Sequence, residues 1–204
     1  MKIVHFSDWH GQQMRLPSAD LYVCTGDMYA DYVQGTEPRA QVAEAAQRAG
    51  WFRTVAASPD APIVCVRGNH DIAPLAPLFV GCNLVHEFVD NEQVTLAGLR
   101  VTGHRGIPSV PLSRGGWSDE LSRADLMDRV RAMPAADLVL THYAPQGILD
   151  SNFGLGGMVN VLWHKLDGHG LHCFGHIHEC GGLVERIDEL TFSNAACTFN
   201  VVTI

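Results

Sequence analysis

Five short apolar runs, each followed by a cluster of polar residues, organise this sequence. Each run has four to six residues and is rich in β-branched side chains, which is typical of strands buried in a sheet. The runs are KIVHF before Asp8, DLYVCT before Asp27, PIVCVR before Asn69, DLVLT before His142 and LHCF before His176. Because ligand sites in open α/β sheets form beyond the carboxyl ends of the strands, this pattern predicts one site built from the five polar clusters.

Two segments between these runs are predicted to be helical. Residues from about 37 to 57 are rich in alanine, with apolar side chains at helical spacing and Gly50 as a mild interruption. Ser118 is the expected N-cap of a second helix that runs to about Met133, because two acids follow it and Pro134 ends the segment. Strands that alternate with helices indicate βαβ units and a partly parallel sheet.

The middle and the end of the chain indicate antiparallel strands. The runs NLVHEFV, VTLAGLRVTG, GLVERID, LTFSNA and TFNVVTI are strand-like and are joined by short polar turns, of which Asp90–Asn91–Glu92 is one. The expected fold class is α/β, a four-layer αββα sandwich in which two mixed β-sheets pack face to face with helices outside. With 204 residues, one domain over residues 1–204 is expected.

The composition argues against some classes of binding partner and favours one cellular compartment. The chain has 22 acidic against 14 basic residues, which argues against a large surface for duplex nucleic acid or for an anionic membrane. The apolar run after Met1 is too short for a signal peptide or a membrane span, so the cytoplasm is the expected location. The six cysteines contain no C-x-x-C pair, and we interpret them as small buried residues in a reducing compartment.

Two histidines stand one residue apart in the stretch CFGHIHEC, residues 173 to 180. In an extended backbone His176 and His178 project to the same side, so their imidazoles converge. Taken alone, such a pair is also compatible with a polar loop or with two structural histidines. The other polar clusters decide between these alternatives.

The ends of the five runs offer oxygen and imidazole donors and no thiolate. Such donors suit Mn, Fe, Zn, Co or Ni and argue against a closed structural zinc site. The residues are Asp8, His10, Asp27, Asn69, His70, His142, His176 and His178. They are too many for one ion, and two ions lying close together need a bridging group such as a carboxylate.

The blocks DWH, GD, GNHD, a lone histidine after a strand, and GHIH follow one another in the order that the calcineurin-like metallophosphoesterase superfamily shows. This resemblance covers the chain from Asp8 to His178 and implies two divalent ions, of which Mn is favoured and Fe, Zn, Ni and Co are alternatives. It implies that Asp8, His10 and His178 hold the first metal, that Asn69, His142 and His176 hold the second, and that Asp27 bridges both. By the same resemblance His70 is the catalytic histidine, oriented by Asp71.

A narrower likeness concerns the segments ADLYVCTGD, THYAPQGILD, HCFGHIHE and SNAAC. They resemble the small brain-type metallophosphoesterase-domain proteins and their bacterial relatives, which act on phosphodiesters including cyclic nucleotides. Some of these proteins carry glycine where this chain has His176, so the histidine favours an active two-metal centre. The implied function is hydrolysis of small phosphodiesters by in-line attack of a metal-bridging hydroxide. His70 is expected to donate a proton to the leaving oxygen or to hydrogen-bond the phosphoryl group.

Other functions stay open at this stage. They are a phosphomonoesterase or protein phosphatase, a nuclease of the repair-exonuclease type, and a catalytically silent metal-bearing scaffold. A small phosphoester is the expected partner, a membrane is not, and exposed hairpin edges are compatible with a homodimer.

Several residues near the motifs have expected roles that the motifs themselves do not specify. Trp9 alternates with two ligand positions and is expected to face the core. Tyr29 is compatible with base stacking or with lining the cleft, and Glu179 with support of the last ligand. Residues 103–116 and 144–157 are the expected loops, where Arg105 and Arg114 are candidate phosphate contacts whose commoner role is a solvated arginine. The remaining histidines are expected to be structural or exposed, namely His5, His86, His104, His164, His169 and His172.

Overall fold

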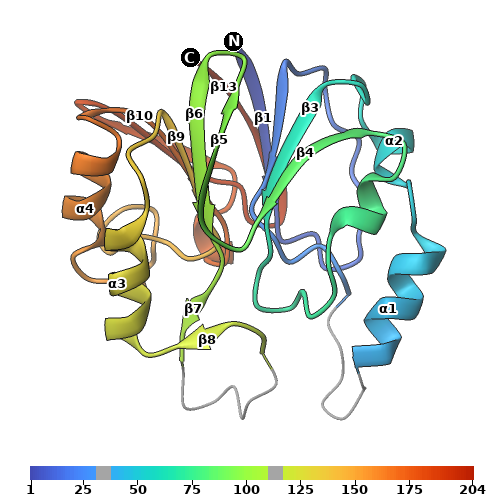
Figure 1. Cartoon of the computed structure of the whole chain (residues 1–204), viewed down its shortest axis with the longest axis horizontal. Helices are drawn as coiled ribbons and strands as arrows, with labels where there is room; N and C mark the ends of the chain where they lie inside the picture. Colours follow the sequence, from blue (N-terminus) through green and yellow to red (C-terminus); the bar gives the residue numbers. More distant parts are fainter. Residues whose placement is uncertain (31–37, 110–116) are drawn as a thin grey trace.

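Two β-sheets lie face to face in the computed structural model, which describes residues 1–30, 38–109 and 117–204 (Figure 1). The first sheet has the order β13-β1-β2-β3-β4. Its first four strands along the chain run parallel, and β13 pairs antiparallel with β1. The bounds are β1 (Lys2–Ser7), β2 (Leu21–Cys24), β3 (Pro62–Val66), β4 (Asn83–Phe88) and β13 (Thr198–Thr203).

The second sheet has the order β11-β12-β10-β9-β6-β5 and is mixed as well. Strands β12, β10, β9 and β6 run parallel, while β11 and β5 form antiparallel edges. The bounds are β5 (Asp90–Leu96), β6 (Leu99–His104), β9 (Leu138–Thr141), β10 (His169–Phe174), β11 (Leu183–Ile187) and β12 (Glu189–Asn194). A short pair, β7 (Ile107–Pro108) and β8 (Glu120–Leu121), lies below this sheet in Figure 1.

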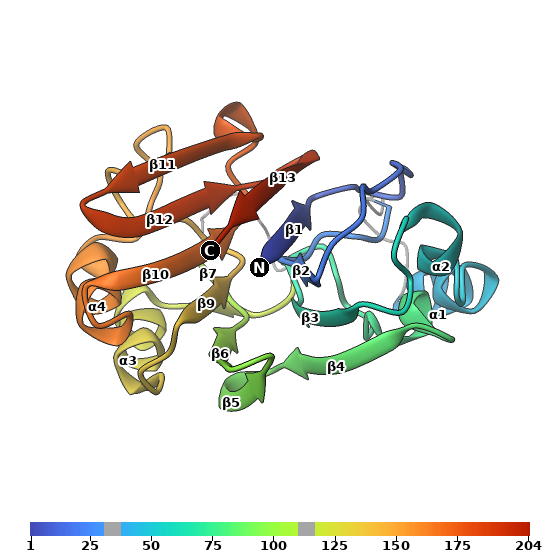
Figure 2. The ribbon, with the colours of Figure 1, turned by 90° about the horizontal axis from the view of Figure 1, so that it is seen from above.

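Helices cover the outer face of each sheet (Figure 2). On the first sheet lie α1 (Pro38–Gln47), α2 (Phe52–Val55) and the 3-10 helix η1 (Ala76–Phe79). On the second sheet lie α3 (Arg123–Ala132) and α4 (Met158–Lys165), whereas the 3-10 helix η2 (His178–Cys180) follows β10. The predicted four-layer αββα sandwich with two mixed sheets is confirmed.

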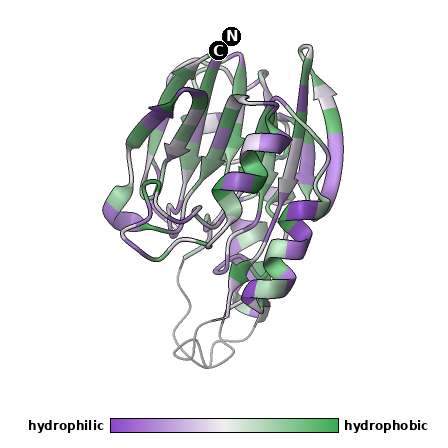
Figure 3. Cartoon of the chain, turned by 90° about the vertical axis from the view of Figure 1, so that its left-hand side faces the viewer, coloured by the Kyte–Doolittle hydropathy of each residue, from purple (hydrophilic) through white to green (hydrophobic). Residues whose placement is uncertain are grey.

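Alternation along the strands builds this layering. In β1 the side chain of Ile3 enters the layer between the two sheets, and its neighbour Val4 enters the layer under α2. The inter-sheet layer joins residues of both sheets, such as Val64 and Leu140, while the layer under α3 and α4 contains Phe174. In Figure 3 the hydrophobic colour is concentrated on the strands, and the helices in front of them carry hydrophilic segments.

The structure corrects two predictions about connections. Asp90, Asn91 and Glu92 do not form a hairpin turn, because they begin β5, which pairs with β6 in the second sheet while β4 pairs with β3 in the first. The chain therefore passes from one sheet to the other between β4 and β5. In the segment predicted as one long helix, Gly50 has a φ of +77° and separates α1 from α2, so it is more than a mild interruption.

The start of α3 also differs from its prediction. Ser122 is the N-cap, since its side chain accepts a hydrogen bond of 3.0 Å from the backbone N–H of Asp125. Ser118, the predicted cap, lies before β8 and makes tertiary contacts instead. The expected loop over residues 103–116 includes the end of β6 and all of β7, and its residues 110–116 lie outside the described part of the chain. No helix among the described residues combines the length and the apolar character that a membrane span requires.

Candidate metal centre

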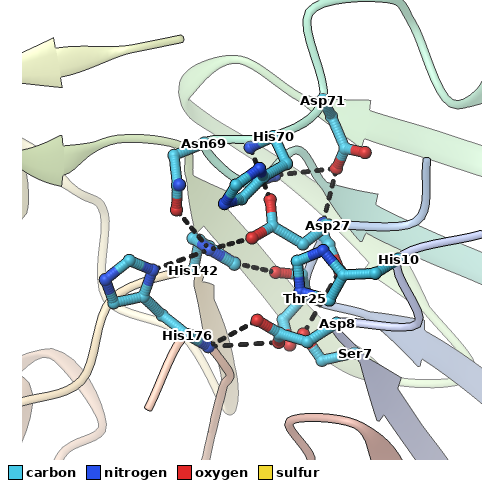
Figure 4. A network of polar contacts seen from close by, with 12 residues as sticks. Ser7, Asp8, His10, Thr25, Asp27, Asn69, His70, Asp71, His142 and His176 are labelled. Carbon is cyan, nitrogen blue, oxygen red and sulfur yellow. Dashed lines mark hydrogen bonds and ion pairs between the residues drawn. The ribbon is translucent and has the colours of Figure 1, made fainter. Parts of the chain in front are cut away.

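The polar residues that follow five strands meet at one end of the sandwich (Figure 4). Asp8 follows β1, Asp27 follows β2, and Asn69 with His70 follows β3, all in the first sheet. From the second sheet, the turn after β9 supplies His142, and the turn after β10 supplies two more histidines. The structure brings together the eight residues at the ends of the five runs, through contacts that are described below.

Four of these residues adopt left-handed backbone conformations. Their φ values are 55° for Asp8, 44° for His10, 53° for Asp27 and 66° for His176. Such values are unfavourable for residues with a Cβ, and they persist where surrounding bonds hold them. Here the backbone N–H of Asp8 donates to Gly26 O at 2.8 Å, and that of His10 donates to Asp27 O at 3.0 Å. The two turns thus fix each other and direct their side chains to one point.

The first cluster consists of Asp8, His10 and His178. Their ligand atoms lie within 4.8 Å of one another. His178 Nε2 is 3.3 Å from His10 Nε2 and 3.3 Å from Asp8 Oδ1. Asp8 is buried and accepts the backbone N–H of His176, while 48% of the His178 side chain is exposed. This cluster is therefore fixed at its carboxylate and open to solvent at its histidine.

The second cluster consists of Asp27, His142 and His176, with Asn69 beside it. His142 Nε2 faces three polar atoms at 3.0 to 3.3 Å, which belong to the other three residues. His142 Nδ1 lies 2.6 Å from Thr25 O, which can only accept a hydrogen bond, so this nitrogen carries the proton. In the neutral ring Nε2 then holds a lone pair, and it faces the lone pairs of two oxygens. Such an arrangement requires a positive charge at its centre.

The pKa values follow from the same geometry. Burial alone would lower the pKa of His142, but the charge of Asp27 and its hydrogen bond raise it to about 10. For the Asp27 carboxyl, burial would raise the pKa, whereas the charge of His142 lowers it. Burial and the neighbouring His142 lower the pKa of His176 to about 4, which leaves this ring neutral, the form that binds metals. The cluster therefore attracts one positive charge, supplied by a proton or by a metal ion.

Asp27 connects the two halves of the centre. Its Oδ1 accepts the backbone N–H of His70 at 2.7 Å, and its Oδ2 lies 3.2 Å from His142 Nε2. The same carboxylate belongs to a cluster with His10 and His70 and to the cluster with His142 and His176. A residue shared in this way has the placement that a bridging ligand of two ions needs.

The donor set fits divalent ions. It combines carboxylate, amide and imidazole groups, and within the described residues the clusters contain no cysteine. The Oδ1 atom of Asn69 faces the second cluster, 3.0 Å from His142 Nε2, so this oxygen would be its metal ligand. Among the described residues the buried Nδ2 group of Asn69 has no hydrogen-bond partner, and as an N–H donor it suits an oxygen of a bound phosphate. If metals are bound, Asp8, His10 and His178 would hold one ion and Asn69, His142 and His176 the other.

Asp71 uses its carboxylate on the backbone of the site. Its oxygens accept N–H groups of Asp27 at 2.6 Å, Met28 at 2.9 Å and Gly68 at 3.0 Å, and also that of Tyr29. Burial and then the charge of Asp27 raise the pKa of Asp71 to about 7. These bonds hold the turn that carries Asp27, and the orientation of the His70 ring by Asp71 stays a prediction.

His70 lies beside the two clusters of proposed ligands, and its ring also forms a group with His10 and Asp27. Its ring centroid is 5.0 Å from that of His10 and 5.8 Å from that of Trp117. The ring is partly exposed, so a substrate can approach it. This position is compatible with a proton donor next to the metals.

Sequence reasoning missed several residues of the site. The aromatic rings of Trp117 and Tyr143 flank His176, with centroid distances of 6.2 and 5.0 Å. Gly68 is another, because it packs directly against the side chains of Asp27 and His142. Adjacency was the only signal in the sequence, since Gly68 precedes Asn69 and Tyr143 follows His142.

The weaker assignments have mixed outcomes. Trp9 faces the core as predicted, and its Nε1 donates to Thr198 O at 3.1 Å. Tyr29 neither stacks nor lines a cleft, because it is buried and its hydroxyl donates to Pro74 O. Arg105 pairs with Asp119 at 3.3 Å. Arg114 lies outside the described residues, and Glu179 is exposed.

The other histidines whose side chains are described are structural or exposed, as expected. His5 is buried between hydroxyl groups of Ser193 and Thr25, at 2.8 and 2.9 Å, and thereby links the two sheets. His172 bonds to Thr141 Oγ1 at 2.9 Å in the second sheet. His104 is buried, His86 packs on the ring of Phe88, and His164 is exposed on α4. The side chain of His169 lies outside the described part of the structure.

Comparison with known proteins agrees with this geometry. A family model described as calcineurin-like phosphoesterase matches residues 1–180. The chain belongs to the calcineurin-like phosphoesterase family. The resemblance predicted from the motifs is thereby confirmed.

Individual proteins are also similar to this member of the calcineurin-like phosphoesterase family. The chain is 30% identical over 122 residues to metallophosphoesterase domain-containing protein 1 of Homo sapiens and to that of Mus musculus. These matches cover 55% of this chain and 36% of each relative, so the chain spans about a third of the length of these proteins. The crystal structure of the protein TT1561 of Thermus thermophilus aligns with a TM-score of 0.51 at 14% identity. The alignment covers 98% of this chain and 88% of TT1561, and it shows a shared fold.

Proposed function

We propose that this calcineurin-like phosphoesterase is a metal-dependent phosphodiesterase that hydrolyses small phosphodiesters such as cyclic nucleotides. The observation that carries the proposal is the position of Asp27, whose carboxylate lies with His10 of the first cluster and with His142 and His176 of the second. Such a shared carboxylate is what a two-ion centre for phosphoester hydrolysis requires.

The chain's own residues would divide the work. One divalent ion would be held by Asp8, His10 and His178, and the other by Asn69, His142 and His176. Asp27 would bind both ions. Bound ions would acidify a water molecule and neutralise charge on the phosphate oxygens. Among the candidate ions we favour Mn, and Fe, Zn, Ni and Co suit the same donors.

His70 would act on the leaving group. Its ring is partly exposed and lies next to that of His10, within reach of a phosphate held between the clusters. From there it would donate a proton to the departing oxygen or hydrogen-bond the phosphoryl group. Asp71 would keep the Asp27 turn in place through its backbone bonds. A rigid turn holds reacting groups at a fixed distance, which is a large part of catalysis by proximity.

The test is hydrolysis of bis-(p-nitrophenyl) phosphate with added Mn and with a chelator, beside the monoester p-nitrophenyl phosphate. We expect metal-dependent hydrolysis with a higher kcat/KM for the diester. His70→Ala should lower kcat by roughly 10² to 10⁴ with unchanged metal content. His164→Ala, which removes an exposed histidine of α4, is the matched control and should retain full activity.

The alternatives are distinguished by the same preparation. A higher kcat/KM for the monoester would make the protein a phosphomonoesterase or phosphatase. Nicking of plasmid DNA would indicate a nuclease, which the formal net charge of −8 disfavours. Metal-loaded protein that is inert toward every phosphoester would be a scaffold. For location we propose the cytoplasm, in agreement with the buried thiols of Cys24, Cys65 and Cys173.

A further inference from the structure

Trp117 presents an aromatic ring at the edge of the metal centre. Its centroid is 5.8 Å from the ring of His70, with an angle of 57° between the planes. The centroid is 6.2 Å from the ring of His176, which it meets edge on. Trp117 therefore stands beside both the candidate proton donor and a ligand of the second cluster.

The backbone next to Trp117 is bound to the site. The N–H of Ser118 donates to Asn69 O at 2.8 Å. The hydroxyl of Ser118 lies 3.3 Å from the carbonyl oxygens of Gly68, Asn69 and Asp71. The turn that carries Asn69 and His70 thus also fixes Trp117. Part of the indole packs on the core under α3 and α4, which holds the ring further.

Of the two described aromatic residues that flank His176, Trp117 is the one that offers surface to a substrate. Tyr143 lies closer to His176, but it is only 5% exposed and its hydroxyl donates to Phe153 O at 2.5 Å. The indole of Trp117 is half-buried and keeps accessible surface. In the first cluster, the exposed His178 offers a polar imidazole in place of an aromatic hydrocarbon face.

We propose that Trp117 determines substrate specificity by stacking on a planar aromatic group that is attached to the phosphate, a nucleobase in the first place. This inference rests on the proposed function and adds the residue that would recognise the base of a nucleotide substrate. Aromatic side chains bind bases of any sequence because every base has a π face, and a fixed ring spends little entropy on doing so. A phosphate held between the two clusters would leave its organic group beside the indole and His70.

The test compares two phosphate monoesters that differ in the base alone, adenosine 5′-monophosphate and ribose 5-phosphate. Binding to Mn-loaded protein is measured by calorimetry. Wild type should prefer the adenosine compound, and Trp117→Ala should weaken its binding by roughly 5- to 100-fold. Binding of ribose 5-phosphate should stay unchanged. Trp117→Phe should keep most of the affinity, because phenylalanine also stacks.

A second readout reports contact in folded protein. Adenosine 5′-monophosphate should quench tryptophan fluorescence in wild type and in Trp163→Phe, where a partly buried indole of α4 is removed as a control. The quenching should vanish in Trp117→Phe. Equal loss of both ligands in Trp117→Ala, quenching that persists in Trp117→Phe, or equal affinity of wild type for both compounds would overturn the proposal. Because these are binding measurements, they can fail while hydrolysis of the diester succeeds.

Discussion

Gly68 allows the sharpest prediction, because an added methyl group would strike the shared carboxylate. A Cβ built at Gly68 would lie 2.1 Å from Asp27 Oδ1, 2.6 Å from Asp27 Cγ and 2.6 Å from Cε1 of His142. The φ of Gly68 lies outside the left-handed region, so alanine fits the backbone itself. Gly68→Ala thus perturbs the centre without replacing any of its proposed ligands.

The magnitude follows from the distances. Real Cβ atoms essentially never approach another heavy atom closer than 3.0 Å, so the Asp27 carboxylate must move by about 1 Å. That shift breaks its bond of 2.7 Å to the N–H of His70 and its contact of 3.2 Å with His142. A misplacement of about 1 Å at a reacting centre costs roughly 10² in rate, and overpacking costs about 1–3 kcal/mol of stability.

The assay combines kcat/KM on bis-(p-nitrophenyl) phosphate with metal analysis and urea unfolding. Gly68→Ala should lose at least roughly 10²-fold in kcat/KM and part of its metal while it remains folded. The matched control is Gly156→Ala, since that glycine is exposed and its Cβ would meet only the end of the Gln146 side chain at 3.0 Å. If Gly68→Ala kept wild-type activity and metal content, the inferred packing around Asp27 would be wrong.

Three further predictions concern metal, pH and the backbone support. Mn²⁺ at about 100 times its Kd should raise the free energy of unfolding by about 2.7 kcal/mol, and Asp27→Asn should abolish the shift in a thermal melt. Burial lowers the pKa of His5 and of His172 to about 3, so the stability gained from their neutral rings is complete above pH 6.5 and is lost as pH falls toward 3. In urea unfolding with a chelator present, the free energy of unfolding should fall by about 1.4 kcal/mol for each ring per unit decrease in pH below 6.5. In the double variant His5→Gln and His172→Gln, the dependence of this free energy on pH should be weaker. Asp71→Asn should cost about 1–3 kcal/mol in the same assay, because an amide nitrogen replaces an oxygen that accepts backbone N–H groups, whereas Asp128→Asn on the exposed face of α3 should be neutral.

Local patterns in the sequence predicted the strands and most of the site. Short β-branched runs with polar ends are readable one at a time, and the topology of parallel strands brings those ends together. The sequence alone could therefore place Asp8, Asp27 and His142 at one edge of the sandwich. The same reasoning could not see that β4 and β5 join different sheets, because a polar turn between two strands looks the same in both cases.

The features that the sequence did not predict depend on tertiary contacts. Ser118 and Ser122 both precede acidic residues and are equally good caps by local rules. Only the folded chain gives the first to the carbonyls of the site and the second to α3. Trp117 was missed for the same reason, since its neighbours His70 and His176 are distant in sequence.

Each proposed ion would be held by ligands from both sheets. Asp8 and His10 belong to one layer and His178 to the other, and Asp27 faces His142 across the same boundary. A cation in either position therefore acts as a clasp between the two layers. Sliding one sheet past the other would break metal–ligand bonds, so bound ions should make the sandwich resist shear. The protein should release its ions only when the two layers separate.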